Sequence, residues 1–142
     1  MPVSHLQDKK REPIVLPAFG AVELEWVVAW DRWYLVIYDK YPLTKGHCLI
    51  IPRRKAVRFK DLKPSEKGRL VHWIEWTQTY LEQILVPTPD GFNLGANDGE
   101  AAGQTIGQFH FHVIPRYQGD VPDPRGGIRW VIPSKACYWD TS

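Results

Sequence analysis

The chain has 142 residues, and its 18 Lys and Arg residues against 16 Asp and Glu residues give a formal net charge of +2. A chain of this length fits one domain, and its 44% of hydrophobic residues can form a core without a disulfide or a metal. The small net charge, with no basic run longer than residues 9–11 or 53–55, predicts that the partner is not a nucleic-acid polymer. The sequence contains no apolar run of the roughly 20 residues that span a bilayer and starts without a signal peptide, so we expect no membrane contact and a cytoplasmic location.

The cysteine pattern indicates neither a zinc site nor a redox pair. Cys48 and Cys137 are the two cysteines, which are too few to hold zinc alone and lie too far apart in the sequence for a C-x-x-C motif. In a reducing compartment they are expected to be unpaired thiols.

The first part of the chain favours β-structure after a polar arm at residues 1–13. Residues 22–26 and 33–37 are rich in Val, Leu, Trp and Tyr, which predicts the two strands of a hairpin. Residues 47–51 form a short apolar run that Pro52 ends, as expected of a buried central strand.

The middle of the chain predicts one long helix, from Pro64 to about Leu85. Proline suits the first position of a helix, and apolar or small residues then recur every three or four positions, at Leu70, Ile74, Thr77, Leu81 and Ile84. The aromatic side chains of Trp73, Trp76 and Tyr80 give this helix more apolar surface than one buried face needs.

The remaining elements are short. Residues 92–95 and 109–115 are predicted strands, residues 97–104 a glycine-rich turn, and residues 130–132 a further candidate strand. Strands around a single long helix predict an α+β domain built on an antiparallel sheet.

Two histidines carry the functional argument. Because side chains two apart on a strand share a face, Gln108, His110 and His112 are expected to form one polar row. A pair of imidazoles can bind a metal, act as base and nucleophile, or be a structural pair, and the spacing alone leaves these readings open.

The turn just before these histidines favours phosphoryl chemistry. Residues 97–105 contain two glycines and several short polar side chains, which suits a turn whose backbone N–H groups converge on a phosphate. A metal site would need a further ligand, such as His47 or an acid, because His72 is expected on the helix.

Residues 103–116 resemble the signature of the histidine-triad (HIT) nucleotide hydrolases and transferases, a Gly-Gln-Ser/Thr followed by His-x-His-x-His and two apolar residues. Residues 46–52 resemble that family's Gly-His-x-Leu-Val-Ile-Pro strand. The resemblance implies a HIT-like α+β fold, with an antiparallel sheet of about five strands, one long helix and a sheet extended by dimerisation. It divides the chain into an arm, a HIT domain and a C-terminal extension, at residues 1–13, 14–120 and 121–142.

One position departs from the family pattern. Gln108 stands where the family has its first triad histidine, while His110 takes the place of the middle, nucleophilic histidine and His112 that of the third. In the family a backbone carbonyl near the first position orients the middle imidazole, and glutamine still supplies that carbonyl. The resemblance therefore implies an activity that is retained but moderated by Gln108.

The resemblance also implies the roles of the site residues. His110 would attack the α-phosphate of a nucleoside phosphoramidate, a dinucleoside polyphosphate or an adenylylated substrate, and water would then release a nucleoside monophosphate. His112 would act beside it in catalysis, and His47 would support the catalytic strand. The expected substrate-binding residues are Asp39, for the ribose hydroxyls, and Asn97, Gln104, Thr105 and Gln108.

Partners and alternatives follow from the same resemblance. We expect a purine nucleotide, with adenosine as its nucleoside, as ligand. We also expect a homodimer and no bound metal or other cofactor, although Mg²⁺ can arrive with the substrate. Two alternatives stay open, a nucleotide-binding regulator of weak activity and a metalloprotein that uses His110 and His112.

Overall fold

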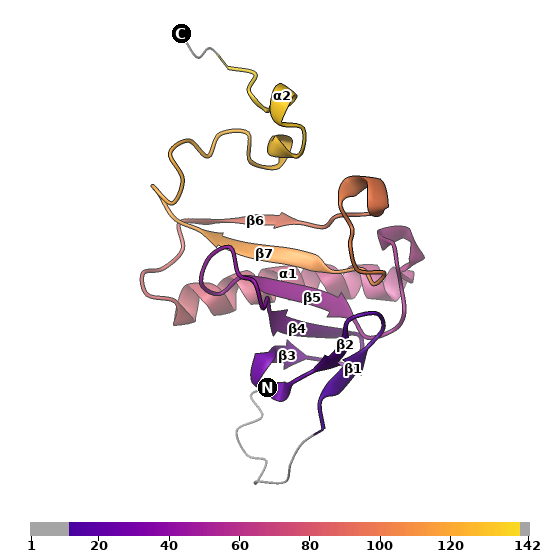
Figure 1. Ribbon diagram of the computed structural model, residues 1–142. Helices are drawn as coiled ribbons and strands as arrows, with labels where there is room; N and C mark the ends of the chain where they lie inside the picture. The colour runs from indigo at the N-terminus through magenta and orange to yellow at the C-terminus, as the bar shows by residue number, and fades with distance from the viewer. Residues whose placement is uncertain (1–11, 140–142) are drawn as a thin grey trace.

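The computed structural model describes residues 12–139. Its centre is a five-stranded antiparallel sheet with the order β3-β4-β5-β7-β6, and one long helix, α1, lies across one face of it (Figure 1). The predicted α+β class, with about five antiparallel strands and one long helix, is therefore confirmed. The bounds of these elements are Val27–Trp30 for β3, Tyr34–Tyr38 for β4, Cys48–Pro52 for β5, Pro64–Ile84 for α1, Gly91–Gly95 for β6 and Phe111–Arg116 for β7.

Strand β5 is the middle of the sheet, as the apolar run predicted. It pairs with β4 on one side and β7 on the other, and all five of its residues are buried. The pairing with β7 places Leu49 opposite His112, which brings a segment from before α1 next to the histidine segment that follows it.

The two faces of the sheet bury different partners. One face packs on α1, and the other packs on a small hairpin of β1 (Ile14–Leu16) and β2 (Gly20–Val22). The hairpin inserts Leu16 and Val22 over Leu35, Ile37, Leu49 and Ile51. Since His112 lies opposite Leu49, its side chain stands on the hairpin side of the sheet.

Helix α1 is fastened to the sheet by polar as well as apolar contacts. Its buried residues include Leu70, Trp73 and Leu81. The indole of Trp73 donates to the carboxylate of Asp31 in the β3–β4 turn, at 2.8 Å. Trp73 is thus part of the core and not surplus surface, whereas Trp76 and Tyr80 are half-buried and stack on each other.

Three strand predictions were wrong in place or type. Residues 24–26 form a 3₁₀ turn, so the first strand of the sheet starts only at Val27, and β7 starts at Phe111 instead of residue 109. Residues 130–132 belong to the 3₁₀ helix Gly127–Val131 and its end. Their β-branched side chains find no neighbouring strand and remain exposed, so the β-propensity has nothing to pack against.

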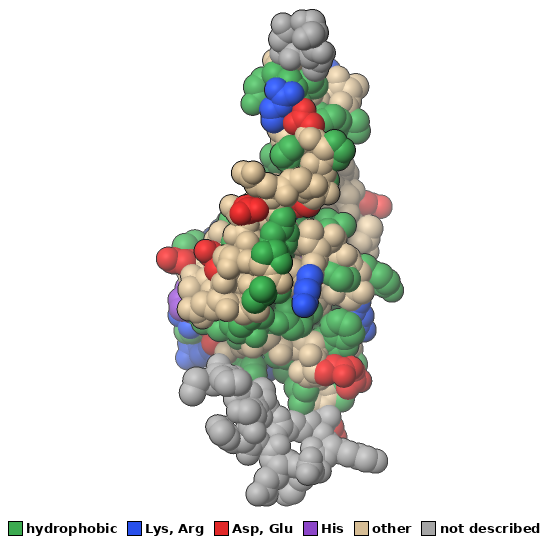
Figure 2. Space-filling model, turned by 90° about the vertical axis from the view of Figure 1, so that its left-hand side faces the viewer, with side chains coloured by type: hydrophobic (Ala, Val, Ile, Leu, Met, Phe, Trp, Pro, Cys, Tyr) green, Lys and Arg blue, Asp and Glu red, His purple; other side chains and the backbone are tan. Residues whose placement is uncertain are grey.

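The segment after β7 forms a small lobe beyond β6, visible at the top of Figures 1 and 2. It holds the 3₁₀ helix just described and the short helix α2 (Pro133–Ala136). Within the lobe, the guanidinium of Arg125 lies 4.4 Å from the ring centroid of Trp139, and the indole of Trp130 donates to Arg125 O at 2.9 Å. The predicted arm falls largely on residues 1–11, outside the described residues, and within residues 12–139 neither helix is long and apolar enough to cross a bilayer.

Gly46 is the position where the fold most depends on a missing side chain. Its φ is +91°, and a Cβ there would lie 2.9 Å from Leu85 Cδ1. Gly46→Ala should therefore lower the free energy of unfolding by about 1–3 kcal/mol. Urea unfolding measures this, and Gly68→Ala is the control. Gly68 lies inside α1 with open space around it, so that change should raise stability by about 0.5–1 kcal/mol. Equal effects of the two changes would contradict this account.

Candidate active site

The hairpin side of the sheet holds a cavity of about 490 Å³ where most of the predicted site residues meet. Its polar lining comes from the segment after β4, the turn before β7, and β7 itself. Five predicted residues line it: Asp39, Asn97, Thr105, His110 and His112. Gln104, Gln108 and His47 do not line it.

His110 is held with one ring nitrogen free. It lies just before β7, and its Nδ1 is 2.9 Å from the backbone oxygen of Gln108. Because a carbonyl oxygen only accepts, Nδ1 carries the proton and Nε2 carries a lone pair. The ring of Phe19 packs edge-on against the imidazole, at 5.1 Å between centroids. The imidazole is thus oriented as the sequence interpretation expected, and its neutral form presents an Nε2 lone pair suited to nucleophilic attack.

His112 is oriented by a second chain of hydrogen bonds, which begins at a backbone group. The N–H of Leu43 donates to His47 Nδ1 at 3.1 Å, so the proton of His47 is on Nε2. That nitrogen is 2.9 Å from His112 Nδ1, which must accept, and the proton of His112 is therefore on its own Nε2. One histidine of the cavity thus offers a lone pair and the other an N–H donor.

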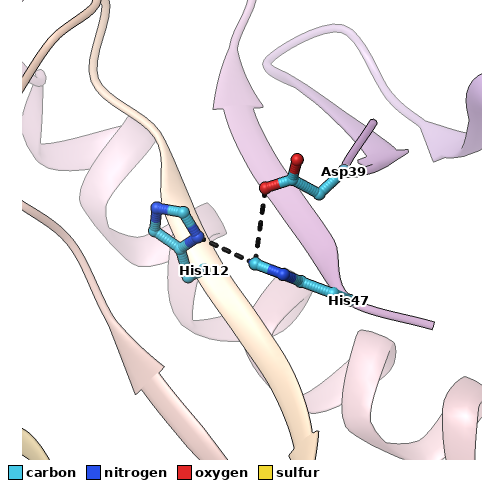
Figure 3. A group of neighbouring side chains, drawn as sticks. All are labelled: Asp39, His47 and His112. Atoms are coloured by element: carbon cyan, nitrogen blue, oxygen red, sulfur yellow. Dashed lines mark hydrogen bonds and ion pairs between the residues drawn. The ribbon is translucent and has the colours of Figure 1, made fainter. Parts of the chain in front are cut away.

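Asp39 and His47 lie beside His112, and His47 contacts both of the other side chains (Figure 3). Asp39 Oδ2 lies 3.5 Å from His47 Nε2, and His47 is only 3% exposed. Burial lowers the pKa of His47, although the charge of Asp39 opposes this. Burial, followed by the charges of His110 and His47, lowers the pKa of His112 to about 4. His112 is therefore neutral at pH 7.

Gln108 does not lie where the alternation of side chains placed it. Its side chain is fully buried and binds the loop after β5. Oε1 accepts from Ala56 N at 2.9 Å, and Nε2 donates to Pro52 O at 2.8 Å and Arg54 O at 2.9 Å. The expected row of three side chains on one face is therefore wrong, because β7 starts at Phe111 and the alternation does not extend back to residue 108. The expected substrate contact by the Gln108 side chain is also corrected, because this side chain is buried away from the cavity.

Gln104 also serves the protein instead of the cavity. Its Oε1 accepts from Gly99 N at 2.9 Å, and its Nε2 donates to Val57 O at 2.7 Å and Ile106 O at 3.0 Å. Each end of the amide is therefore engaged within the turn, so the expected phosphate contact by this side chain is also corrected. Gln104 shapes the turn, while Asn97 and Thr105 remain on the cavity wall.

Three side chains lie close enough together to be considered as metal ligands. The ligand atoms of Asp39, His47 and His112 all lie within 4.8 Å of one another. Two nitrogen ligands of a tetrahedral zinc ion are about 3.3 Å apart, however, and the 2.9 Å between the two rings is a hydrogen-bond distance. A metal would have to displace that shared proton. The group does not contain His110, so the pair named in the metalloprotein alternative is not the pair that the fold brings closest.

The sequence model of the HIT domain family matches residues 24–119, which is more than half of the chain. The chain belongs to the HIT family. Its likeness to an uncharacterised HIT-like protein of Methanocaldococcus jannaschii is 35% identity over 94 residues, covering 66% of this chain and 70% of that protein. Its likeness to the asymmetrical bis(5′-nucleosyl)-tetraphosphatase of Schizosaccharomyces pombe is 39% identity over 79 residues, covering 56% of this chain and 42% of that enzyme.

Solved HIT structures agree with the fold. A HIT family protein from Bacillus anthracis superposes with a TM-score of 0.61 at 34% identity, covering 66% of this chain and 65% of that one. The HIT fold is thus shared. The chain matches less than half the length of the yeast enzyme.

Replacing Gln108 should affect stability more than the proton arrangement of the site. Gln108→Leu leaves one N–H and two carbonyls of the loop after β5 without partners, which should cost about 2–4 kcal/mol in urea unfolding. His110 binds the backbone of residue 108, so ¹⁵N NMR of the imidazole should still show the proton on Nδ1. Gln83→Leu on the exposed side of α1 is the control and should change stability by no more than about 0.5 kcal/mol. A lost Nδ1 proton at unchanged stability would contradict this account.

The low pKa of His112 predicts a loss of stability in mild acid. An unfolded histidine binds a proton near pH 6.5, whereas folded His112 does so only near pH 4, so between these values the unfolded state holds more protons. The free energy of unfolding should fall by at most about 3 kcal/mol as the pH drops through this window. His112→Asn should flatten the fall between pH 6.5 and 5, whereas His72→Asn, at an exposed helix position, should leave it unchanged. The same slope in all three proteins would contradict the assignment to His112.

Proposed function

We propose that this HIT protein is a nucleotide hydrolase that cleaves its substrate at the α-phosphate through a nucleotidyl-His110 intermediate and releases a nucleoside monophosphate. The observation that carries the proposal is the free Nε2 lone pair of His110, fixed by the Nδ1 hydrogen bond to the Gln108 carbonyl, on the wall of the cavity. A neutral imidazole so held is a competent nucleophile toward phosphorus at neutral pH.

The reaction would proceed in two displacements. His110 Nε2 forms a bond to the α-phosphorus while the bond to the leaving group breaks, and the His112 Nε2–H is the available donor to the departing atom or to a phosphate oxygen. Water then attacks the same phosphorus, the N–P bond breaks, and the imidazole is restored. Asn97, Thr105 and the backbone N–H groups of their turn would hold the phosphate oxygens as charge develops on them.

The rest of the cavity suits a nucleoside. Asp39 lies where a carboxylate can accept the ribose hydroxyls, and an apolar wall of Phe19, Val22, Trp26, Ile37 and Leu49 can enclose a base. The size of this wall supports a purine, with adenine as the base we propose. The likeness to the yeast tetraphosphatase supports a dinucleoside polyphosphate as substrate, beside a nucleoside phosphoramidate or an adenylylated species.

The other parts of the proposal concern assembly and cofactors. We propose a cytoplasmic homodimer that joins through α1 and an edge of the sheet. The half-buried Trp76 and Tyr80, and the position of β6 at an edge of the sheet, support that surface. No metal has a step in the proposed reaction, and Mg²⁺ enters only with the polyphosphate of a substrate.

Two other functions rest on particular features of the site. Gln108 in place of an imidazole favours a nucleotide-binding regulator with weak turnover, in which the cavity binds AMP but product forms slowly. The group of Asp39, His47 and His112 favours a metalloprotein, which would require stoichiometric metal after purification and loss of activity with a chelator.

Removal of His110 tests the hydrolase directly. His110→Ala should lower AMP release from AMP-morpholidate and from diadenosine tetraphosphate by about a thousandfold or more, because the nucleophile is lost. Chromatography of the products measures this release. Mass spectrometry of the intact wild-type enzyme, quenched without acid, should show AMP attached to the protein. His72→Ala, on the exposed side of α1, should keep full activity.

The outcomes separate the three functions. Wild-type protein that binds AMP but releases none from either substrate supports the regulator and contradicts the hydrolase. Turnover that survives His110→Ala contradicts His110 as the nucleophile. Turnover of AMP-morpholidate that a chelator abolishes supports the metal-dependent alternative.

A further inference from the structure

The charge of this protein is strongly segregated, which its small net charge conceals. Residues 53–69 contain eight of the 18 Lys and Arg residues and only two of the 16 Asp and Glu residues. This segment therefore has a formal charge of +6, and since the whole chain has +2, the rest of it has −4. A net charge close to zero thus says little about the field at this end of the molecule.

The fold gathers this charge at one end of the sheet. Residues 53–69 comprise the loop after β5, the 3₁₀ turn Phe59–Asp61 and the first turns of α1, to the right in Figure 1. Arg32, from the β3–β4 turn, joins them and lines a groove of about 360 Å³ together with Trp33 and Lys63. The face shown in Figure 2 carries Lys and Arg scattered among Asp and Glu instead.

The carboxylates near this end are already occupied. Glu66 is bound by Arg54, Asp31 by Arg69 and Asp98 by Arg58. Within residues 12–139, six cations of this end take part in no ion pair, and we call them the basic end: Arg32, Arg53, Lys55, Lys60, Lys63 and Lys67. All of them except Lys67, which is half-buried, are exposed, so their charge is available to a partner.

Aromatic rings lie among these cations. Phe59 is 43% exposed, with Lys67 Nζ at 5.2 Å from its ring centroid. Trp33 is partly exposed in the groove, with the guanidinium of Arg32 4.2 Å from its ring centroid. Unpaired cations interleaved with accessible rings are the pattern of sites that bind single-stranded nucleic acid, where cations follow the phosphates and rings stack on the bases.

We propose that the basic end binds single-stranded nucleic acid. The six cations hold successive phosphates, and bases stack on the exposed parts of Phe59 and Trp33, next to the cation that lies over each ring. This interaction is separate from the cavity that holds His110, and it does not depend on the proposed hydrolase. It departs from the expectation, drawn from the net charge, that no nucleic-acid polymer is a partner.

Fluorescence anisotropy of the full chain with a labelled 20-nucleotide oligothymidylate tests the proposal. The wild-type protein should bind at about 50 mM salt, with a slope of log K against log salt of up to about −4 if all six cations contact phosphates. The Lys55→Gln/Lys60→Gln double variant should weaken binding at least about fivefold and flatten the slope by about 1.

The matched control removes two charges elsewhere. Lys45→Gln/Lys135→Gln has the same net charge as the test variant, and both its positions are exposed and lie outside the basic end. It should leave the slope unchanged. No binding by the wild-type protein, or equal weakening by both double variants, would overturn the basic end as the binding surface.

Two further ligands test the class of partner. An abasic oligomer of the same length keeps the phosphates but loses the bases, so it should bind at least about fivefold more weakly if bases stack on the rings. A 20-residue polyglutamate should compete poorly. Equal binding of the abasic oligomer, tighter binding of a duplex, or displacement by polyglutamate at equal concentration would overturn single-stranded nucleic acid as the partner.

Discussion

The backbone and side chain of Gln108 hold the site together in two directions. Its carbonyl oxygen accepts the Nδ1 proton of His110, while its buried carboxamide bonds Pro52, Arg54 and Ala56. The end of β5, the loop after it and the segment that holds His110 are therefore fixed to each other through one residue. A carboxamide has two N–H donors and an acceptor oxygen, so it can bond two carbonyls and an N–H at once. A neutral imidazole has only one N–H donor and cannot make all three bonds. Gln108 thus supplies the carbonyl that orients His110 and also bonds three backbone groups of the neighbouring segment.

The positions of the protons on the site histidines follow from two backbone groups, because a backbone N–H can only donate and a backbone C=O can only accept. An N–H at Leu43 fixes His47, His47 fixes His112, and a C=O at residue 108 fixes His110. The two cavity histidines therefore have opposite neutral tautomers: His110 offers a lone pair on Nε2, and His112 offers an N–H there. Burial keeps His112 neutral, so this imidazole keeps its tautomer across the physiological pH range.

The sequence predicted the parts of the site that depend on local pattern. The helix from Pro64 and the central strand after His47 were expected, because hydrophobic periodicity acts over short spans. The family motif predicted that one site would contain Asp39, Asn97, Thr105, His110 and His112. The sequence did not reveal that the side chains of Gln104 and Gln108 bond backbone groups of the protein, since an amide side chain suits a ligand and a backbone group equally well. The β1–β2 hairpin was missed because strands of three residues give almost no periodic signal.

The pairing of β5 with β7 also sets when the site can exist during folding. His47 and His112 are 65 positions apart, with the whole of α1 between them, and they meet only through this pairing. Contacts of such long range carry a large loop-closure cost and are slow to form compared with the helix. In a refolding chain we therefore expect α1 to form before β5 pairs with β7. The hydrogen bond between His47 and His112 then forms late in folding.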